Sequence, residues 1–426
     1  MTDQILAALA KCGIDDYYIN LAQDRSAQLF FIKKSLDMKR TTNETSATVT
    51  VFKTFEEDGQ KYRGASTVKV QESMTPQELE TMLADAYYAA GFVKNKYYEL
   101  YHGTKEAMTE VKSGLTDKTL AQIAQGYAEA LFAEDTQEKV FINSAEIFAY
   151  EHTEHIISSS GVDVAYSRKS AQGEFVVQCI DGQDVETYQS FAYNDWNPEA
   201  LRAKAKSTIE MTYARAKAKS APAAGNYRLI LSGDYVSELL GYYSDRAESY
   251  MIYPKYSTFS VGCDVQGTEV TGDMVNLTLK ADVPYSSEGI PMKDRELVRD
   301  GKLQLIHGGN RFAQYLGIEP TGNYNSMKMP AGSVTLAEMK AAPYLEVVNF
   351  SDFQMDTFTG HFGGEIRLAF LYDGEKVIPV TGGSVNGNIF EAQKTFVFSK
   401  ELQQEERFEG PKSVCMDGVS VAGMNA

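Results

Sequence analysis

The stretch SELLGYYSD, residues 237–245, carries one carboxylate on a pattern typical of a helix. Glu238 is followed three residues later by Gly241, which is the Glu-x-x-Gly frame of a metallopeptidase helix. On such a helix, histidines hold zinc and the glutamate activates a water molecule. Here Ser237 and Tyr242 stand where that chemistry needs histidines. The stretch is therefore either a zinc site that has lost its zinc ligands or an ordinary apolar helix.

The ligand chemistry of these four positions argues against a bound metal ion. A catalytic zinc needs about three protein ligands in addition to a water molecule. Glu238 alone cannot retain the ion against hydration. Tyr242 is a poor ligand, because its phenol would have to ionise from a pKa of about 10. We therefore predict neither a metal nor another cofactor at Ser237, Glu238, Gly241 and Tyr242.

A second group of candidate ligands is EHTEH, residues 151–155, with two histidines and two carboxylates in five positions. The surrounding run has the alternation of a strand, where His152 and His155 point to opposite faces. The zincin arrangement needs histidines four residues apart on a helix. We therefore interpret this stretch as a solvated strand end.

The remaining histidines and cysteines have no partner in sequence that would make them catalytic. His307 and His361 each lie beside paired glycines, which indicates a backbone turn, and His102 follows a tyrosine pair as a surface residue would. Cys415 lacks a neighbour that would lower its pKa, so we predict a structural thiol. The chain also contains no GxSxG elbow, P-loop or dinucleotide fingerprint.

Composition and charge exclude several classes of protein. The 426 residues are 43% hydrophobic and 23% charged, which is ordinary for globular proteins, and the formal net charge is −17. Such a charge repels phosphate backbones and anionic membranes. The chain starts without a basic leader segment, with Thr2 as the expected cap of a first helix, and no run reaches the length of a membrane span. We therefore expect a cytoplasmic protein with free thiols and no direct contact with nucleic acid or membrane.

The order of expected elements predicts an α+β fold with three parts. A hairpin over residues 46–70 turns at Glu57-Asp58-Gly59, and a helix with a capping box at Thr75 and Glu78 follows. A similar order of helix, strands and helix continues to about residue 219, as if a helix-meander-helix unit occurred twice. Pro222 and Gly225 then mark the main boundary. We predict units over 1–110 and 111–222 and a β-rich domain over 223–426.

The third part resembles the C-terminal domain of the TldD/PmbA family, whose PmbA branch is also called TldE and which was once described as modulators of DNA gyrase. The matching segments follow one another in the order expected for the family; they cover residues 287–303, 317–323, 358–388 and 416–423. His361 stands where the family usually has aspartate. The resemblance covers the last two hundred or so residues well, and the first half only through its element order.

The resemblance implies a role without zinc. In the TldD branch the motif is His-Glu-x-x-x-His, which places Ser237 and Tyr242 at its two histidines and Glu238 at its glutamate. That branch also takes a cysteine ligand from a segment that here reads ELQQEERFEG, residues 401–410, and contains no cysteine. The chain is therefore similar to the PmbA/TldE branch. This implies a metal-free subunit that pairs with a zinc-bearing TldD-like subunit in a cytoplasmic peptidase of unfolded or small peptides, and that binds extended peptide at strand edges.

Two alternatives remain open from the sequence. The chain could be an enzyme in its own right, with Glu238 as general base in an altered site and His361 nearby. It could also be a peptide-binding or scaffold protein that forms a homodimer and has no peptidase partner. Stoichiometric zinc in the purified chain would overturn the metal-free subunit, and peptide hydrolysis that a chelator does not affect would support the enzyme.

Overall fold

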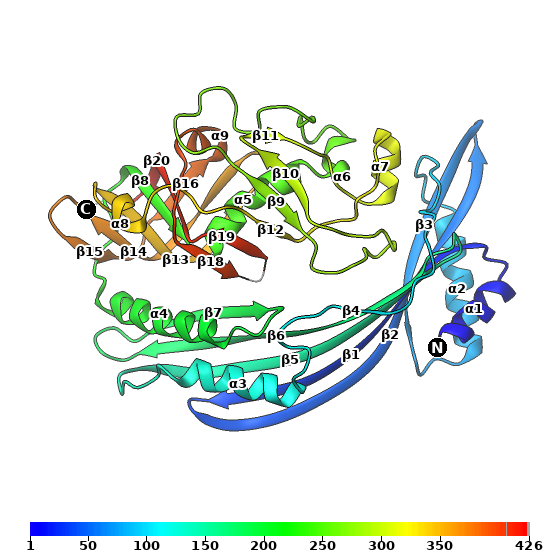
Figure 1. Cartoon of the computed structure of the whole chain (residues 1–426), viewed down its shortest axis with the longest axis horizontal. Coiled ribbons are helices and arrows are strands. Elements are labelled where there is room, and N and C mark those ends of the chain that lie inside the picture. Colours follow the sequence, from blue (N-terminus) through cyan, green and yellow to red (C-terminus); the bar gives the residue numbers. More distant parts are fainter. Residues whose placement is uncertain (406, 424–426) are drawn as a thin grey trace.

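The computed structural model describes residues 1–405 and 407–423. Figure 1 shows a long, curved sheet built by the first half of the chain, with the second half lying above its concave side. In the part of the chain that is described, no helix is both long and apolar enough to cross a membrane.

The first half of the chain forms one seven-stranded sheet in the order β3-β2-β1-β5-β6-β4, with β7 also pairing with β6. Its strands are β1 (Asp16–Ile32), β2 (Ser35–Glu57), β3 (Gln60–Gln71), β4 (Thr109–Glu110), β5 (Val140–Ser158), β6 (Asp163–Cys179) and β7 (Val185–Tyr193). All neighbours are antiparallel except β4 and β6. Since β1 pairs with β5 from Tyr18↔Ser158 to Ile32↔Ser144, the two predicted N-terminal units share a single sheet.

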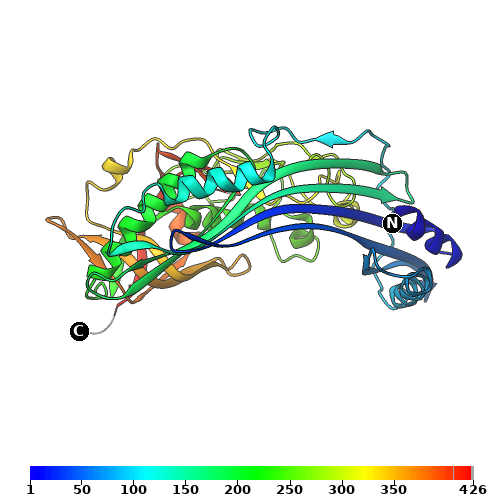
Figure 2. The same ribbon diagram turned by 90° about the horizontal axis from the view of Figure 1, so that it is seen from below.

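Four helices cover one face of this sheet: α1 (Thr2–Lys11), α2 (Pro76–Ala90), α3 (Leu120–Phe132) and α4 (Pro198–Lys217). Helices α1 and α2 pack at one end of the long strands and α3 and α4 at the other (Figure 2). In β1 the odd-numbered Ile19 and Leu29 belong to these two apolar cores. The alternate side chains, among them Asp24 and Gln28, therefore point to the opposite face, toward the second half of the chain.

The second half of the chain contains two further sheets. One has the order β11-β10-β9-β12-β19-β18, and the other β13-β8-β20-β16-β14-β15, with β17 pairing with β20. Because β13 also pairs with β14, five strands of the second sheet close into a ring. The strands are β8 (Gly225–Ser232), β9 (Leu277–Lys280), β10 (Arg295–Arg299), β11 (Lys302–Leu303), β12 (Ser326–Lys328), β13 (Tyr344–Met355), β14 (His361–Tyr372), β15 (Val377–Val380), β16 (Ser384–Asn388), β17 (Val397–Phe398), β18 (Leu402–Glu405), β19 (Phe408–Pro411) and β20 (Ser413–Ala422).

Short helices join these strands: α5 (Asp234–Arg246), α6 (Ser249–Ile252), α7 (Asn310–Leu316), α8 (Leu336–Met339) and α9 (Ile389–Ala392). Helix α5 lies where the sequence predicts helix, whereas α6, α8 and α9 were not predicted. Each of these three has only four residues, which is too short for an apolar period to be visible.

The mixed α+β class predicted from the sequence is confirmed. The order of helix, three strands and helix does occur twice, as α1-β1-β2-β3-α2 and α3-β5-β6-β7-α4. The prediction of Thr2 as the cap of α1 was wrong, because Thr2 is the first residue inside the helix and Met1 precedes it without a side-chain cap. The predicted boundaries at 110 and 222 stay predictions.

Candidate functional site

Helix α5, which carries the Glu-x-x-Gly frame, begins directly after the central strand β8. The connection is Gly233, whose φ of 70° lies in the left-handed region that favours glycine. One side of the helix, including Leu239 and Leu240, is fully buried in the core of the second half. Asp234, Ser237 and Glu238 lie three and four residues apart, so they share the other side. That side faces the N-terminal sheet.

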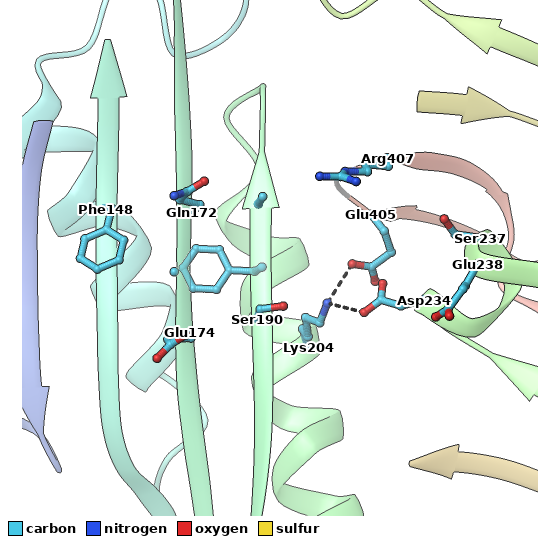
Figure 3. Close-up of a pocket in the computed structure, with 13 residues that line it drawn as sticks. Phe148, Gln172, Glu174, Ser190, Lys204, Asp234, Ser237, Glu238, Glu405 and Arg407 are labelled. Atoms are coloured by element: carbon cyan, nitrogen blue, oxygen red, sulfur yellow. Dashed lines mark hydrogen bonds and ion pairs between the residues drawn. The ribbon is translucent and has the colours of Figure 1, made fainter. Parts of the chain in front are cut away.

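A cavity of about 560 Å³ separates this side of α5 from the sheet. Its wall includes Ser237 and Glu238 of α5 and side chains from four other parts of the fold: Phe148 of β5, Gln172 and Glu174 of β6, Ser190 and Ala192 of β7, and Glu405 at the end of β18. Figure 3 shows the strands on one side and α5 on the other, with the polar side chains pointing into the space between them. The cavity thus joins the two halves of the chain.

The three strand residues contributed by β7 are consecutive, Ser190, Phe191 and Ala192. Successive side chains of a strand point to opposite faces of a sheet. These residues belong to a strand at the end of this part of the sheet, so the cavity lies beside the edge of β7. Among the described strands, β7 pairs only with β6.

A lysine occupies the middle of the acidic side chains in this cavity. The Lys204 ammonium of α4 lies 2.8 Å from a carboxylate oxygen of Glu405 and 3.8 Å from one of Asp234 (Figure 3). Burial works to lower the pKa of Lys204, but the two carboxylates outweigh it and raise the pKa above its ordinary value. Lys204 therefore stays protonated and pairs with both acids.

Glu238 lies apart from this ion-paired group. Its side chain is open to the cavity, yet partial desolvation raises its pKa to about 7, and the negative charges of Asp352 and Asp234 add to the effect. A hydrogen bond from the backbone N–H of Met355 works in the opposite direction. Glu238 therefore binds its proton at a higher pH than an ordinary glutamate does.

Tyr242, the second of the positions compared with a zinc ligand, does not reach the cavity. Its side chain is 1% exposed and makes edge contacts with the rings of Tyr243, Phe259 and Phe390 at centroid distances of 5.4, 6.2 and 6.2 Å. Burial raises the pKa of its phenol. The structure therefore brings Ser237 and Glu238 together on the cavity wall and separates Tyr242 from them.

This set of side chains does not fit a zinc ion. The described lining of the cavity offers the hydroxyls of Ser190 and Ser237 and the carboxylates of Glu174 and Glu238 but no imidazole or thiol, whereas Asp234 and Glu405 already hold the Lys204 ammonium. Within the described ranges, histidine, cysteine, aspartate and glutamate side chains nowhere gather in groups of three or more that could hold a metal ion. Gly241 matches the motif in position, but the fold does not require a glycine there, because a methyl group added at this residue would meet no atom within 4 Å.

Sequence reasoning missed most of the groups that surround Glu238. Lys204 and the edge of β7 carry no motif, and they reach the cavity only through the packing of the sheet against the second half of the chain. One signal was present: the segment 401–410, examined for its lack of cysteine, supplies Glu405 and Arg407 to the wall. This segment therefore lies on the same cavity wall as Glu238, but nothing in the sequence indicated that Glu405 pairs with Lys204.

The other candidates identified in the sequence lie elsewhere. His152 is in the middle of a network on the inner face of the sheet, with Nδ1 2.7 Å from Asp24 and Nε2 3.6 Å from Glu154, so the prediction of a solvated strand end was wrong. The strand continues past it to Ser158 and is covered by the second half of the chain. His361 starts β14 and lines a groove whose wall does not include Glu238, so its role beside Glu238 stays a prediction.

His307 and Cys415 are both buried. Nε2 of His307 lies 2.9 Å from the carbonyl oxygen of Ser244, and burial lowers the pKa of the ring to about 4. Burial raises the pKa of the Cys415 thiol, although Arg228 opposes this, in agreement with a structural thiol. All four cysteines fall among the described residues, and none forms a disulfide.

Residues 224–423 match the family model described as the PmbA/TldA metallopeptidase C-terminal domain. The second half of the chain, with α5 and its cavity wall, therefore belongs to the TldD/PmbA family, as the motifs predicted. None of the curated proteins matches the chain.

Solved structures extend the likeness to the whole fold. TldE from Thermococcus kodakarensis has a TM-score of 0.78 at 16% identity, with 99% of this chain and 100% of that chain covered. A protein from Bacteroides thetaiotaomicron named "putative modulator of DNA gyrase" has a TM-score of 0.78 at 15% identity, and one of the same name from Thermotoga maritima has 0.73 at 16%; 99% of each chain is covered in both cases. At these identities the likeness establishes the fold.

Proposed function

We propose that this chain is the metal-free subunit of a cytoplasmic TldD/TldE-type peptidase, and that it holds an extended segment of an unfolded or small peptide in the cavity between β7 and α5. The family of the second half supports a peptidase-related role. The observation that carries the proposal is the Lys204 ammonium, which lies among the cavity carboxylates where a metal ion would need them free. The catalytic zinc then comes from a TldD-like partner subunit.

The edge of β7 supports the binding of an extended peptide. A strand edge presents unpaired N–H and C=O groups to which another chain can add as a further strand. The cavity meets this edge along Ser190, Phe191 and Ala192, and Gln172 and Glu174 of β6 extend the wall beside it. Backbone recognition of this kind accepts many sequences, which suits a protein that handles unfolded peptides.

Co-expression tests the division of labour between two subunits. The chain is expressed alone and together with a tagged subunit that carries His-Glu-x-x-x-His, and the metal content of each purified species is measured by mass spectrometry. We expect co-purification of the pair, zinc in stoichiometric amount only when the partner is present, and peptide hydrolysis by the pair alone. Stoichiometric zinc in the isolated chain, held near Glu238, would overturn the proposal.

The mode of peptide binding has its own test. Two isomeric peptides of alternating valine and threonine are N-methylated on either the odd or the even amides, and their binding to the full chain is followed by fluorescence anisotropy. Addition to a strand edge uses every second N–H, so one isomer should bind and the other should lose at least tenfold in affinity. Equal binding of the two isomers would show that no strand is added.

A second function is favoured by one observation, the pKa of Glu238. A carboxylate with a pKa of about 7 is suited to general-base catalysis at neutral pH. In that case the isolated chain would hydrolyse peptides in the presence of a chelator, and Glu238→Gln would abolish the activity. If the chain co-purifies with the zinc-bearing subunit and is inactive when isolated, the result favours the first function. If the chain forms a homodimer and does not co-purify with the zinc-bearing subunit, the result favours a scaffold protein.

A further inference from the structure

A second, smaller cavity opens beside the first one. It has a volume of about 220 Å³ and lies between the inner face of the sheet and the loops after β9 and before β12. Gln172, Ala192 and Arg407 line both cavities, so the two are neighbours along β6 and β7. This second cavity is rich in side chains that donate hydrogen bonds: Arg168, Gln172, Asn194, Asn323 and Asn325.

The donors of these five side chains are not used within the protein. Nε of Arg168 is buried and has no hydrogen-bond partner, and no carboxylate of the described residues lies within 4 Å of the guanidinium. The side-chain amides of Gln172, Asn194, Asn323 and Asn325 also have no hydrogen-bond partner among the described residues, and those of Gln172, Asn323 and Asn325 are exposed. Most buried polar groups in proteins are paired. The buried, unpaired Nε of Arg168 therefore indicates a place for a negatively charged acceptor, to which the nearby amides can also donate.

Among the described residues of this wall the acidic side chain is Asp282, and it already has partners. Asp282 accepts a hydrogen bond from the hydroxyl of Ser326 and lies 3.8 Å from the Lys280 ammonium, which also pairs with Glu409. Asp282 therefore does not supply the acceptor for Arg168. With Arg168, Arg407 and Lys280 against Asp282, the described lining of this cavity carries a net positive charge.

We propose that this second cavity binds a carboxylate of the peptide held at the edge of β7, with Arg168 as the anchoring cation and the four amides as further donors. Planar carboxylates match the fork of an arginine guanidinium. The carboxylate comes from the C-terminus of the peptide or from an acidic side chain; both present the same group. The inference rests on the proposed function, because it places an anchor beside the cavity that receives the peptide, and it defines the substrate class as peptides with a carboxylate at that position.

Three peptides and the full chain test this site. The peptides share an N-terminal uncharged fluorophore and the sequence Val-Thr-Val-Thr-Val-Gln. The first peptide has a free C-terminal carboxylate, and the second has a C-terminal amide. The third also has a C-terminal amide, but its last residue is glutamate instead of glutamine. Fluorescence anisotropy gives each Kd. We expect the amide to bind at least tenfold more weakly than one of the two carboxylate peptides, and the stronger of those two identifies the source of the carboxylate.

Variants connect this preference to the cavity. Arg168→Gln should abolish the preference, whereas Arg25→Gln, on the opposite face of the same sheet, should retain it. If Arg168→Gln does not fold, Asn325→Asp places a negative charge in the same cavity and should also abolish the preference. Equal binding of all three peptides, or a preference that survives in both cavity variants, overturns the inference and leaves the peptide-binding function intact. Absence of binding by every peptide overturns both, and failure to pair with a zinc-bearing subunit overturns only the proposed function.

Discussion

Replacement of Lys204 by methionine tests whether the ion-paired group holds the two halves of the chain together. Removal of one partner from a buried ion pair costs about 3–5 kcal/mol, because the other charge stays desolvated. The Lys204 and Glu405 side chains are 15% and 22% exposed, and Asp234 is 57% exposed. Solvent therefore screens part of the loss, and we expect Lys204→Met to lower the free energy of unfolding by about 2–3 kcal/mol.

The change should be visible as a lower melting temperature. With an unfolding entropy of about 2.1 cal/mol/K per residue, such a loss lowers the Tm of a chain of 426 residues by about 2–3 °C if it unfolds as one unit. Differential scanning calorimetry measures this shift. Lys206→Met is the matched control, since Lys206 lies two residues along the same helix, is exposed, and should change the Tm by less than about 0.5 °C.

The pH dependence of the variant gives a second measure. Without the ammonium, Glu405 faces Asp234 alone, and its pKa, already raised by burial, rises further. A carboxyl whose pKa is higher in the folded state than in the unfolded state stabilises the fold below the unfolded value, about 4.3 for glutamate, and loses this contribution as the pH rises through the folded value. The loss of unfolding free energy caused by Lys204→Met should therefore be smaller at pH 5 than at pH 7.5. An equal deficit at both values would refute the ion-pair explanation.

Three further predictions concern α5. Gly241→Ala should raise the free energy of unfolding by about 0.5–1 kcal/mol, because a helix-interior glycine is replaced where a methyl group meets nothing; a lower Tm would contradict this. The double variant Ser237→His with Tyr242→His should bind no zinc by mass spectrometry and should melt earlier, since residue 242 points into the core; stoichiometric zinc would show that the core can open. Glu238 should titrate by carbon NMR with a midpoint of about 7, stability should fall as the pH rises from about 4.5 to 7, and Asp352→Asn should lower the midpoint; a midpoint near 4.5 in the unaltered chain would refute the reasoning.

Local structure was the part of the fold that the sequence predicted best. The capping box of α2 forms between Thr75 and Glu78 as expected. The hairpin turns at Asp58 and Gly59, whose φ values of 53° and 76° fit a two-residue turn between β2 and β3. These features depend on residues that are neighbours in the chain, and short patterns describe them fully.

The site was predicted only in part, because its contacts join distant parts of the chain. Glu238 was identified from the helix that carries it, but its neighbours come from the packing of two halves. The Lys204–Glu405 pair spans 201 positions, and no local pattern in either segment points to the other. Arg168 is one of many charged residues in an alternating strand, and only the tertiary structure shows that it has no partner.

The pairing of β1 with β5 has a consequence for synthesis of the chain. Partners in this ladder are 112 to 140 positions apart, from Ile32↔Ser144 to Tyr18↔Ser158. At a translation rate of about 5–20 residues per second, the edge of β1 emerges roughly 6–28 s before the segment that covers it. During that interval a nascent chain exposes one edge of β1 over fifteen ladder positions, while β2 can pair with the other edge. Ribosome-bound fragments that stop before residue 140 should therefore bind chaperones or associate with one another.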